Sequence, residues 1–328
     1  MTKTLKSLSP GTTLVVPGSN HNGVAPILRK LADDHHAVGT TLLDTRDIID
    51  IFGFDGKEPA NSDSDRANWG NNNYRVSNIR QYLNSVGPDW YEPQHYRDEP
   101  PSTFYMYAGY GAYEQRDGFL SAFPKEFVDR IVATPVETLM PDSDVGDIIT
   151  LNDKIFLLSL TEMGLRDEEG PADGTIIPFF SNGNSPLKKP TQQAINNSKM
   201  TDKDLDISKP WDLLSRTPHR ETTDSILYVG FYFSTYENQY FFQGYTSYAC
   251  YSHGIAPAMN LPSNTTVSDA PNAQGHYEII PTPPIGTPKI KIGTENKEIL
   301  EMYLNVNGSN KAIVEAHISI NGTKKPWV

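Results

Sequence analysis

The stretch of residues 225–233 limits the choice of fold more than any other part of the sequence. Ile, Leu, Tyr, Val, Phe, Tyr and Phe follow one another there in close succession, and such a run predicts a buried strand. Only 37% of all residues are hydrophobic, yet 10% are aromatic and 17 are tyrosines. The apolar weight therefore lies in aromatic rings, which suit both a sheet-rich core and a binding surface.

Short elements of both kinds are predicted around this strand. Val76, Ile79 and Leu83 recur at helical spacing, and Ser77 before them is a suitable N-cap. Strand signals and helix signals occur along the same chain, so we expect an α+β fold class. The expected strands are residues 12–16, 40–43, 148–150 and 154–158, the last two around a turn at Asn152-Asp153; the expected helices are 26–32, 76–84, 125–132 and 191–200; the expected loops are the Asn-rich 61–73 and the proline-punctuated 88–101.

Charge and cysteine content exclude several classes of partner. The formal net charge of −12 repels phosphate backbones, which argues against nucleic acid. There is no lysine-rich amphipathic helix and no apolar run of about 18 residues, so we expect no membrane partner. The N-terminus lacks the apolar core of a signal peptide. The single cysteine, Cys250, forms neither an internal disulfide nor a multi-cysteine metal site.

The composition changes after Leu261. Residues 263–288 are rich in Ser, Thr, Asn and Pro, which predicts a linker, with one short strand signal at 277–280. Beyond it, residues 301–308 and 315–322 form an internal repeat of an alternating strand followed by Asn-Gly, a strong hairpin signal. Residues 289–292 alternate in the same way. We therefore expect a small β-repeat module over residues 289–328.

Several motifs, taken together in this order, resemble an uncharacterised domain found in many phage and prophage structural proteins of Gram-positive gut bacteria. That domain resembles the formylglycine-generating-enzyme branch of the C-type-lectin fold. The resemblance covers roughly residues 8–262, and the tail repeat is similar to short modules that end such phage proteins. The motifs are Ser-Asp-Ser-Asp-Arg at 62–66, Trp-Gly-Asn-Asn-Asn-Tyr at 69–74, residues 76–84, Trp90-Tyr91, residues 117–123, residues 153–164, Ser-Arg-Thr-Pro at 215–218 and residues 252–258.

The resemblance implies a C-type-lectin-like domain over residues 1–262 and a place on the virion. It implies attachment to a host cell-surface glycan or protein, contacts with other virion proteins, and a homo-oligomer. The formylglycine-generating enzymes need a cysteine pair and a metal site, which Cys250 alone does not supply, so we expect no enzyme activity and no cofactor. Two departures stand out: Trp211 lies where the family usually has a Trp-Trp-Leu-Arg strand, and Ala256 lies where it usually has Arg. The second departure puts a buried Arg–carboxylate pair at that position in doubt.

The polar-aromatic stretch ahead of Pro257 is the predicted contact surface. Tyrosine interleaved with Ser, Asn and Gly is typical of adaptable binding loops. The resemblance implies that this segment faces outward and is sometimes diversified by a retroelement. Residues 225–233 are instead expected to be mainly core, and residues 235–252 mainly exposed. The candidate ligand-binding residues are Tyr232, Tyr236, Asn238, Tyr240, Phe242, Tyr245, Ser247, Tyr248 and Tyr251.

Two other functions remain open from the sequence. One is a structural capsid-decoration or baseplate protein without a receptor, in which the tyrosines would pack against another subunit. The other is a cell-wall glycan hydrolase that uses two carboxylates from Glu162, Asp167, Glu168 and Glu169, although adjacent carboxylates in a polar loop are usually solvated.

Nucleophilic and metal chemistry have weaker signals. Cys250 has His253 within sequence reach, but a lone cysteine is more often an inert small hydrophobe. Asn61-x-Asp63-x-Asp65 has alternate oxygens like a calcium loop, yet the glycine and glutamate of an EF-hand are absent, which leaves open only a calcium site of another geometry. His35-His36 lacks zinc-ligand spacing. We therefore predict no catalytic residue and no metal ligand.

Overall fold

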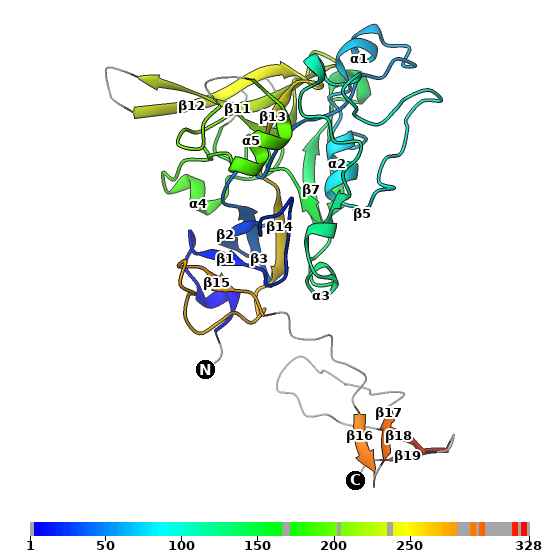
Figure 1. The fold of residues 1–328 in the computed structure, drawn as a ribbon, viewed down its shortest axis with the longest axis vertical. Coiled ribbons are helices and arrows are strands. Elements are labelled where there is room, and N and C mark those ends of the chain that lie inside the picture. The colour runs from blue at the N-terminus through cyan, green and yellow to red at the C-terminus, as the bar shows by residue number, and fades with distance from the viewer. Residues whose placement is uncertain are drawn as a thin grey trace. The chain divides into compact units, whose positions relative to one another are not determined.

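Two antiparallel-rich sheets form the body of the protein in the computed structural model (Figure 1). The model describes residues 3–165, 171–201, 205–234, 239–280, 289–292, 295–298, 317–320 and 323–326, with the main chain alone for 232–234, 239–240 and all residues beyond 280. The chain divides into two units, Met1–Pro281 and Thr282–Val328. The protein is a mixed α/β chain with mostly sheets and few, short helices, as the sequence predicts at that level.

The first sheet has the strand order β15-β1-β2-β3-β14-β9. Its register pairs Leu14 of β1 with Leu28 of β2, and Leu43 of β3 with Met259 of β14, so apolar residues from both ends of this unit share one core. The strands are β1 Thr13–Val15, β2 Ile27–Asp33, β3 Thr40–Thr45, β9 Ile155–Phe156, β14 Ala258–Pro262 and β15 Tyr277–Glu278.

The second sheet has the order β12-β11-β10-β13-β4, and its strands β11 and β12 form the longest hairpin. Two direct continuations connect the sheets, β3 to β4 and β13 to β14. Main-chain hydrogen bonds hold these crossings together, from Ile49 to Ile255 and from Thr45 to Pro257. The strands are β4 Asp50–Gly53, β10 Leu213–Pro218, β11 Ser225–Ser234, β12 Gln239–Tyr248 and β13 Ser252–Ile255.

Helices and small hairpins cover the edges of these sheets. Ser77 caps α2 by accepting a hydrogen bond from the Arg80 amide, as the sequence predicts, and Thr191 caps α5 in the same way. The helices are α1 Ser64–Trp69, α2 Asn78–Leu83, α3 Lys125–Val128, α4 Pro178–Ser181, α5 Gln192–Ser198 and the 3-10 helices η1 Leu5–Ser7, η2 Tyr107–Gly109, η3 Leu120–Ala122 and η4 Asp142–Asp144. The small pairs are β5 Val86–Gly87 with β6 Gly118–Phe119, and β7 Thr134–Leu139 with β8 Ile148–Asp153.

The predicted helix at residues 26–32 is wrong, because these residues form β2 between β1 and β3. Pairing on both edges outweighs the local helical pattern. Lys30 shows the cost of that placement: its fully buried ammonium group donates to the carbonyls of Leu5 and Leu8 and to Asp33. The side chain is thus satisfied inside the sheet rather than in solvent.

Two further loop and turn predictions need correction. The Asn-rich segment 61–73 contains helix α1, capped by Asp63, which accepts from the Asp65 and Arg66 amides. Asn152 and Asp153 do not form a turn, since they are the last residues of β8, paired with Pro135 and Thr134 of β7.

The expected linker at 263–288 is wrong over its described part, residues 263–280. Val267 and Ile279 are buried in the core, and β15 pairs in parallel with β1. The folded body therefore extends past residue 262 to about Pro281.

The described part of the tail consists of two hairpins, each considered by itself. The predicted strand at 289–292 is present as β16 Lys289–Ile292, paired with β17 Glu295–Glu298. β18 His317–Ile320, in the second repeat copy, pairs with β19 Thr323–Pro326. The first repeat copy, residues 301–308, lies outside the described residues.

Candidate functional site

Helix α1 lies at one end of the second sheet (Figure 1). Four aromatic rings from α1, η2 and the segment at the end of β12 meet in this region. Trp69 stacks on Tyr248, with ring centroids 4.5 Å apart and planes 15° from parallel. Tyr107 stacks on Tyr251 at 3.9 Å and 23°. Edge contacts join the two stacks, from Tyr251 to Trp69 at 6.5 Å and to Tyr248 at 5.5 Å. We call Trp69, Tyr107, Tyr248 and Tyr251 the aromatic cluster.

The main chain of Cys250 holds the aromatic cluster together. Its amide donates to the Trp69 carbonyl at 2.8 Å, and its carbonyl accepts from the Tyr107 amide at 3.1 Å. Cys250 lies between Tyr248 and Tyr251 in sequence, so one residue links α1, η2 and the turn after β12. Gly70 ends α1 at φ +85°, where a Cβ would lie 2.8 Å from the Asp55 carbonyl oxygen. The position of Trp69 therefore depends on glycine at this point.

The aromatic cluster is partly open to solvent. Tyr107 is 43% exposed and Tyr248 is 37% exposed, while Trp69 and Tyr251 are half-buried. Desolvation and then the Tyr107 hydroxyl raise the pKa of Tyr251 to about 12, so this phenol stays protonated. Rings held in fixed positions with exposed faces and edges, and with a neutral hydroxyl among them, can stack on an apolar surface and hydrogen-bond at its edge.

The nine predicted contact residues fall into three groups. Tyr248 and Tyr251 belong to the aromatic cluster, and Ser247, which precedes Tyr248 on β12, is half-buried. Tyr232 and Tyr240 lie on β11 and β12, where only the main chain is described, and Tyr236 and Asn238 lie outside the described residues.

Phe242 and Tyr245, the remaining predicted residues, are packed on the sheet. Phe242 packs against the second core cluster. Tyr245 stacks on Tyr228 at 5.8 Å and lies over Gly230, where a Cβ would come within 2.4 Å of its ring. Strand alternation sends neighbouring side chains to opposite faces, so a continuous polar-aromatic stretch does not form one continuous surface.

Trp69 and Tyr107 are cluster members that the sequence analysis did not select as contact residues. Trp69 lies in one of the recognised motifs, but nothing in its local pattern indicates that it meets Tyr248. Tyr107 follows a proline-rich loop and owes its position to the hydrogen bond with Cys250. Contacts between residues so far apart in the sequence cannot be predicted from the spacing of residues within a segment.

A family model covers most of the folded body and the whole aromatic cluster. Residues 38–263 match the model described as a domain of unknown function, DUF6273. The chain belongs to the DUF6273 family. No curated protein and no solved structure matches the chain. All four residues of the aromatic cluster therefore lie inside the DUF6273 domain, whereas β1, β2 and β15 complete the first sheet from outside the matched range.

Cys250 and His253 of the DUF6273 domain do not form a nucleophile–base pair. Burial raises the pKa of the Cys250 thiol to about 12, so the thiolate is scarce at neutral pH. Burial also lowers the pKa of His253 to about 4, and neither of its ring nitrogens has a hydrogen-bond partner among the described residues. His253 instead stacks on Tyr228 at 4.2 Å, so it acts as a flat apolar ring.

Replacing His253 by Phe is expected to reduce the loss of stability in acid. The folded protein keeps this ring neutral down to pH about 4, whereas the unfolded chain protonates it near pH 6.5. The neutral His253 ring therefore costs no stability above pH about 6.5. As the pH falls from there toward 4, the free energy of unfolding decreases by about 3 kcal/mol because the unfolded chain binds the proton. Urea unfolding at pH 7 and pH 4.5 measures the effect. Equal pH slopes for the wild type and His253→Phe would contradict it.

Glu162, the hydrolase candidate, is a buried partner of Arg216 in the DUF6273 domain. Arg216 donates to both its carboxylate oxygens, at 2.6 and 2.9 Å, and His36 hydrogen-bonds it at 2.8 Å. Burial would raise the pKa of Glu162, but the Arg216 charge and these hydrogen bonds lower it to about 2. A carboxyl group that stays ionised cannot serve as a general acid. Asp167, Glu168 and Glu169 lie outside the described residues.

A pocket of about 320 Å³ opens beside Glu162 and is lined by His35, His36, Glu137 and Thr150. The nitrogens of His35 and His36 and an oxygen of Glu162 lie within 4.8 Å of one another, which the sequence spacing does not predict. Because Arg216 already neutralises the carboxylate, a cation there would meet an existing positive charge. This cluster is therefore a poor metal site.

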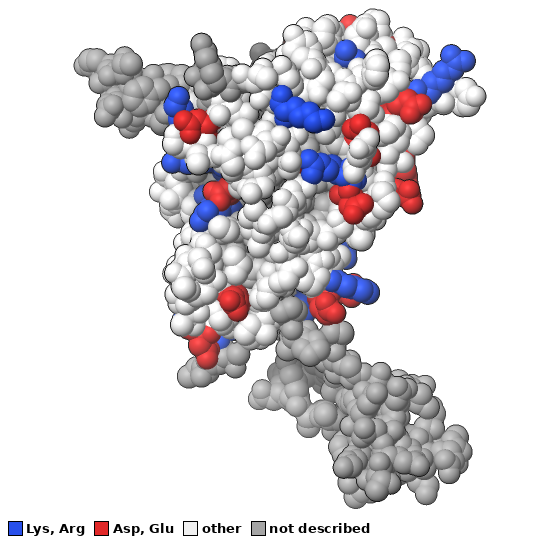
Figure 2. Space-filling model, viewed as in Figure 1, with Lys and Arg blue, Asp and Glu red and all other residues white. Residues whose placement is uncertain are grey.

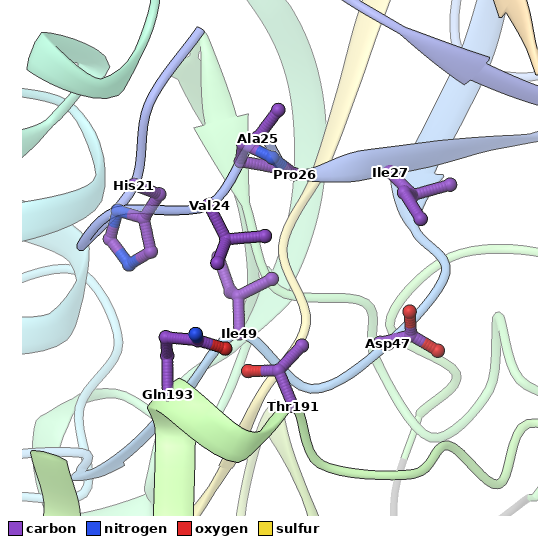
Figure 3. A pocket seen from close by; sticks show the side chains of 9 residues that line it. All are labelled: His21, Val24, Ala25, Pro26, Ile27, Asp47, Ile49, Thr191 and Gln193. Carbon is purple, nitrogen blue, oxygen red and sulfur yellow. The ribbon is translucent and has the colours of Figure 1, made fainter. Parts of the chain in front are cut away.

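A second cavity lies between the segment before β2 and the start of α5 (Figure 3). Its volume is about 50 Å³, well below the roughly 300 Å³ of a small ligand pocket. His21 at its edge is committed to Asp50 by a 2.5 Å hydrogen bond. The cavity is large enough for water only. It is lined by His21, Val24, Ala25, Pro26, Ile27, Asp47, Ile49, Thr191 and Gln193.

Charge on the DUF6273 domain is mixed. Figure 2 shows Lys and Arg interspersed with Asp and Glu on one face, separated by wide uncharged areas. Among the described helices, none combines the length and the apolar character needed to cross a bilayer. The aromatic cluster adds stacked, partly exposed rings to this mixed surface.

Proposed function

We propose that this protein is a non-enzymatic attachment protein displayed on a bacteriophage particle, and that its aromatic cluster contacts a host cell-surface glycan. The observation that carries the proposal is the pair of fixed, partly exposed ring stacks at Trp69–Tyr248 and Tyr107–Tyr251. The place on a virion rests on the resemblance of the sequence motifs to phage and prophage structural proteins. The fold that this resemblance implies is C-type-lectin-like, and the sheet-rich body is compatible with it.

Sugar recognition fits the chemistry of the aromatic cluster. Pyranose rings present apolar C–H faces, which pack on aromatic faces, and a rim of hydroxyls, which hydrogen-bond to phenols. Each aromatic contact contributes about 0.5–1.5 kcal/mol beyond area burial. Such single-site affinity is weak, but many copies on one particle raise the avidity by orders of magnitude. We propose that the copies form a homo-oligomer anchored to other virion proteins through the N-terminal region or the tail module.

Trp69→Ala and Tyr248→Ala are each expected to weaken binding to host cells by about tenfold or more, because each removes half of one ring stack. Tyr248→Phe keeps the ring and should retain most of the binding. The assay is binding of the labelled protein to whole Gram-positive gut bacteria, together with a glycan array. Thermal unfolding of every variant verifies that the fold is intact.

Tyr277→Ala is the matched control, because Tyr277 is a half-buried tyrosine in the first sheet, at the opposite end of the body from α1 (Figure 1). It should bind as the wild type does. If Trp69→Ala and Tyr248→Ala also bind as the wild type does, the aromatic cluster is not the contact surface. If they instead change only self-association, the cluster is a subunit interface of a structural virion protein.

A further inference from the structure

A second group of side chains, separate from the aromatic cluster, places negative charge in the protein interior. Glu58 lies between β4 and α1, and His95 and Asp98 lie in the proline-rich loop 88–101. One potential ligand atom from each of these three residues lies within 4.8 Å of the other two. Asp55, which is fully buried just after β4, adds a third carboxyl group. Its two oxygens already accept hydrogen bonds from the main-chain amides of Asn71 and Asn78.

The local turn orients His95 and Asp98 toward the same point. The Asp98 amide donates to the His95 carbonyl at 3.1 Å, and Asp98 Oδ2 hydrogen-bonds both the His95 amide at 2.9 Å and the ring nitrogen Nδ1 at 2.7 Å. Glu58 is fixed from its own side, since its amide donates to the Arg66 carbonyl and its Oε2 accepts from Asn61. The three side chains are therefore preorganised rather than free to avoid one another.

His95, whose Nδ1 lies 2.7 Å from Asp98 Oδ2, is the one side chain of this group that can carry a positive charge. Among the described residues, no lysine or arginine forms an ion pair with Asp55, Glu58 or Asp98. Burial, and then repulsion from Glu58, raise the pKa of Asp55 well above its usual value. Glu162 differs from these carboxyl groups, because the buried Arg216 forms an ion pair with it.

Asp98 supplies an independent sign of a missing partner. Its side chain is only 3% exposed, and its Oδ1 is buried with no hydrogen-bond partner in the part of the chain that the structure describes. An unsatisfied buried carboxylate oxygen is costly, and this one belongs to a residue that faces Glu58 and His95. A cation between them would supply a counter-charge to the Asp98 carboxylate and to the neighbouring ones.

We propose that Glu58, His95 and Asp98 bind a divalent cation of the first transition series. A mixed set of one imidazole nitrogen and carboxylate oxygens suits Zn²⁺ or Mn²⁺, whereas Ca²⁺ favours oxygen ligands alone. On binding, His95 Nδ1 exchanges Asp98 for the metal. Asp55 remains outside the ligand set and contributes charge. The cation joins the loop 88–101 to the segment between β4 and α1, and this assignment does not depend on the proposed glycan contact.

Metal binding to the untagged full chain tests the proposal. After treatment with EDTA and dialysis, the protein is titrated with ZnCl₂, MnCl₂ and CaCl₂, and binding is followed by calorimetry, elemental analysis and thermal unfolding. We expect one equivalent of Zn²⁺ or Mn²⁺ and a higher melting temperature in its presence. No stoichiometric binding of either ion, or a response to Ca²⁺ alone, would overturn the assignment.

Glu58→Gln, His95→Gln and Asp98→Asn are expected to lose the bound equivalent and the thermal response. Glu58→Gln is the decisive variant, because it removes one buried negative charge and should leave the metal-free melting temperature unchanged or higher. A residue with a purely structural role would lower it. Glu99→Gln changes an exposed carboxylate in the same loop and should bind metal as the wild type does. Wild-type metal binding by Glu58→Gln and His95→Gln would refute the site.

Discussion

Arg216→Met is expected to lower the free energy of unfolding by about 3–5 kcal/mol, the largest effect of any single substitution proposed for this protein. Arg216 is fully buried. Besides Glu162, it donates to the Glu137 carbonyl at 2.8 and 3.0 Å and to the Leu157 carbonyl at 2.8 Å. Removing the guanidinium leaves a buried carboxylate without its counter-charge and several carbonyls without donors. Chemical denaturation followed by circular dichroism measures the loss.

A double variant separates the charge from the shape of this pair. Glu162→Gln with Arg216→Met removes both charges, so it should recover part of the stability that Arg216→Met loses. Arg220→Met is the matched control, because Arg220 pairs with Asp142 near the surface, where an ion pair contributes less than about 1 kcal/mol. If Arg216→Met lowers the free energy of unfolding no more than Arg220→Met does, the buried Glu162–Arg216 pair does not stabilise the fold.

The Glu162–Arg216 pair also makes the stability of the fold depend on pH in acid. Since the folded pKa of Glu162 is about 2 and a free glutamate titrates near 4.3, the unfolded state binds more protons between these values. The stabilisation is complete above pH about 4.3 and is lost as the pH falls toward 2. The double variant should therefore lose less stability than the wild type between pH 5 and pH 3.

Asp44→Asn is expected to destabilise the fold by about 3 kcal/mol, because Asp44 is the shared partner of two buried cations. It accepts from Arg29 at 2.7 and 3.1 Å and from the buried ammonium group of Lys188. Burial lowers the pKa of Lys188 to about 8 even with Asp44 beside it. Without the carboxylate, Arg29 and Lys188 face each other uncompensated. Urea unfolding at pH 7 measures the change.

Lys188→Met in the Asp44→Asn background should restore part of the lost stability, because it removes one of the two like charges. Arg46 and Asp47 form a more exposed pair in the following loop, and Asp47→Asn should cost less than about 1 kcal/mol. No recovery in the double variant would mean that the loss in Asp44→Asn arises from hydrogen bonding rather than charge.

Elements with local causes were predictable from the sequence. The helix at 76–84 is present as α2 because Ser77 caps it and its apolar positions recur within two turns. Strand β11 is present because residues 225–233 prefer an extended, buried backbone whatever they pair with. The mainly buried β11 and the partly exposed described end of β12 also agree with the expectation for that hairpin.

Elements with distant causes were not predictable. Residues 26–32 carry a helical pattern and become β2 only because β1 and β3 pair on either side. Residues 263–280 have a linker-like composition, and yet Val267 and Ile279 complete a core whose other members come from much earlier in the chain. A polar composition shows that a segment can lie in solvent, but it does not show whether other parts of the chain pack over its few apolar residues.

The sequence by itself determined that this is a sheet-rich, acidic protein with a tyrosine-rich hairpin and a single cysteine. Only the tertiary structure decided which aromatic rings form a surface, because the Cys250 main chain brings Trp69 and Tyr107 to Tyr248 and Tyr251. It alone brought Glu58 to His95 and Asp98. The physical reason is the same in both cases: local preferences act over a few residues, whereas these sites depend on main-chain hydrogen bonds and burial between segments far apart in the chain.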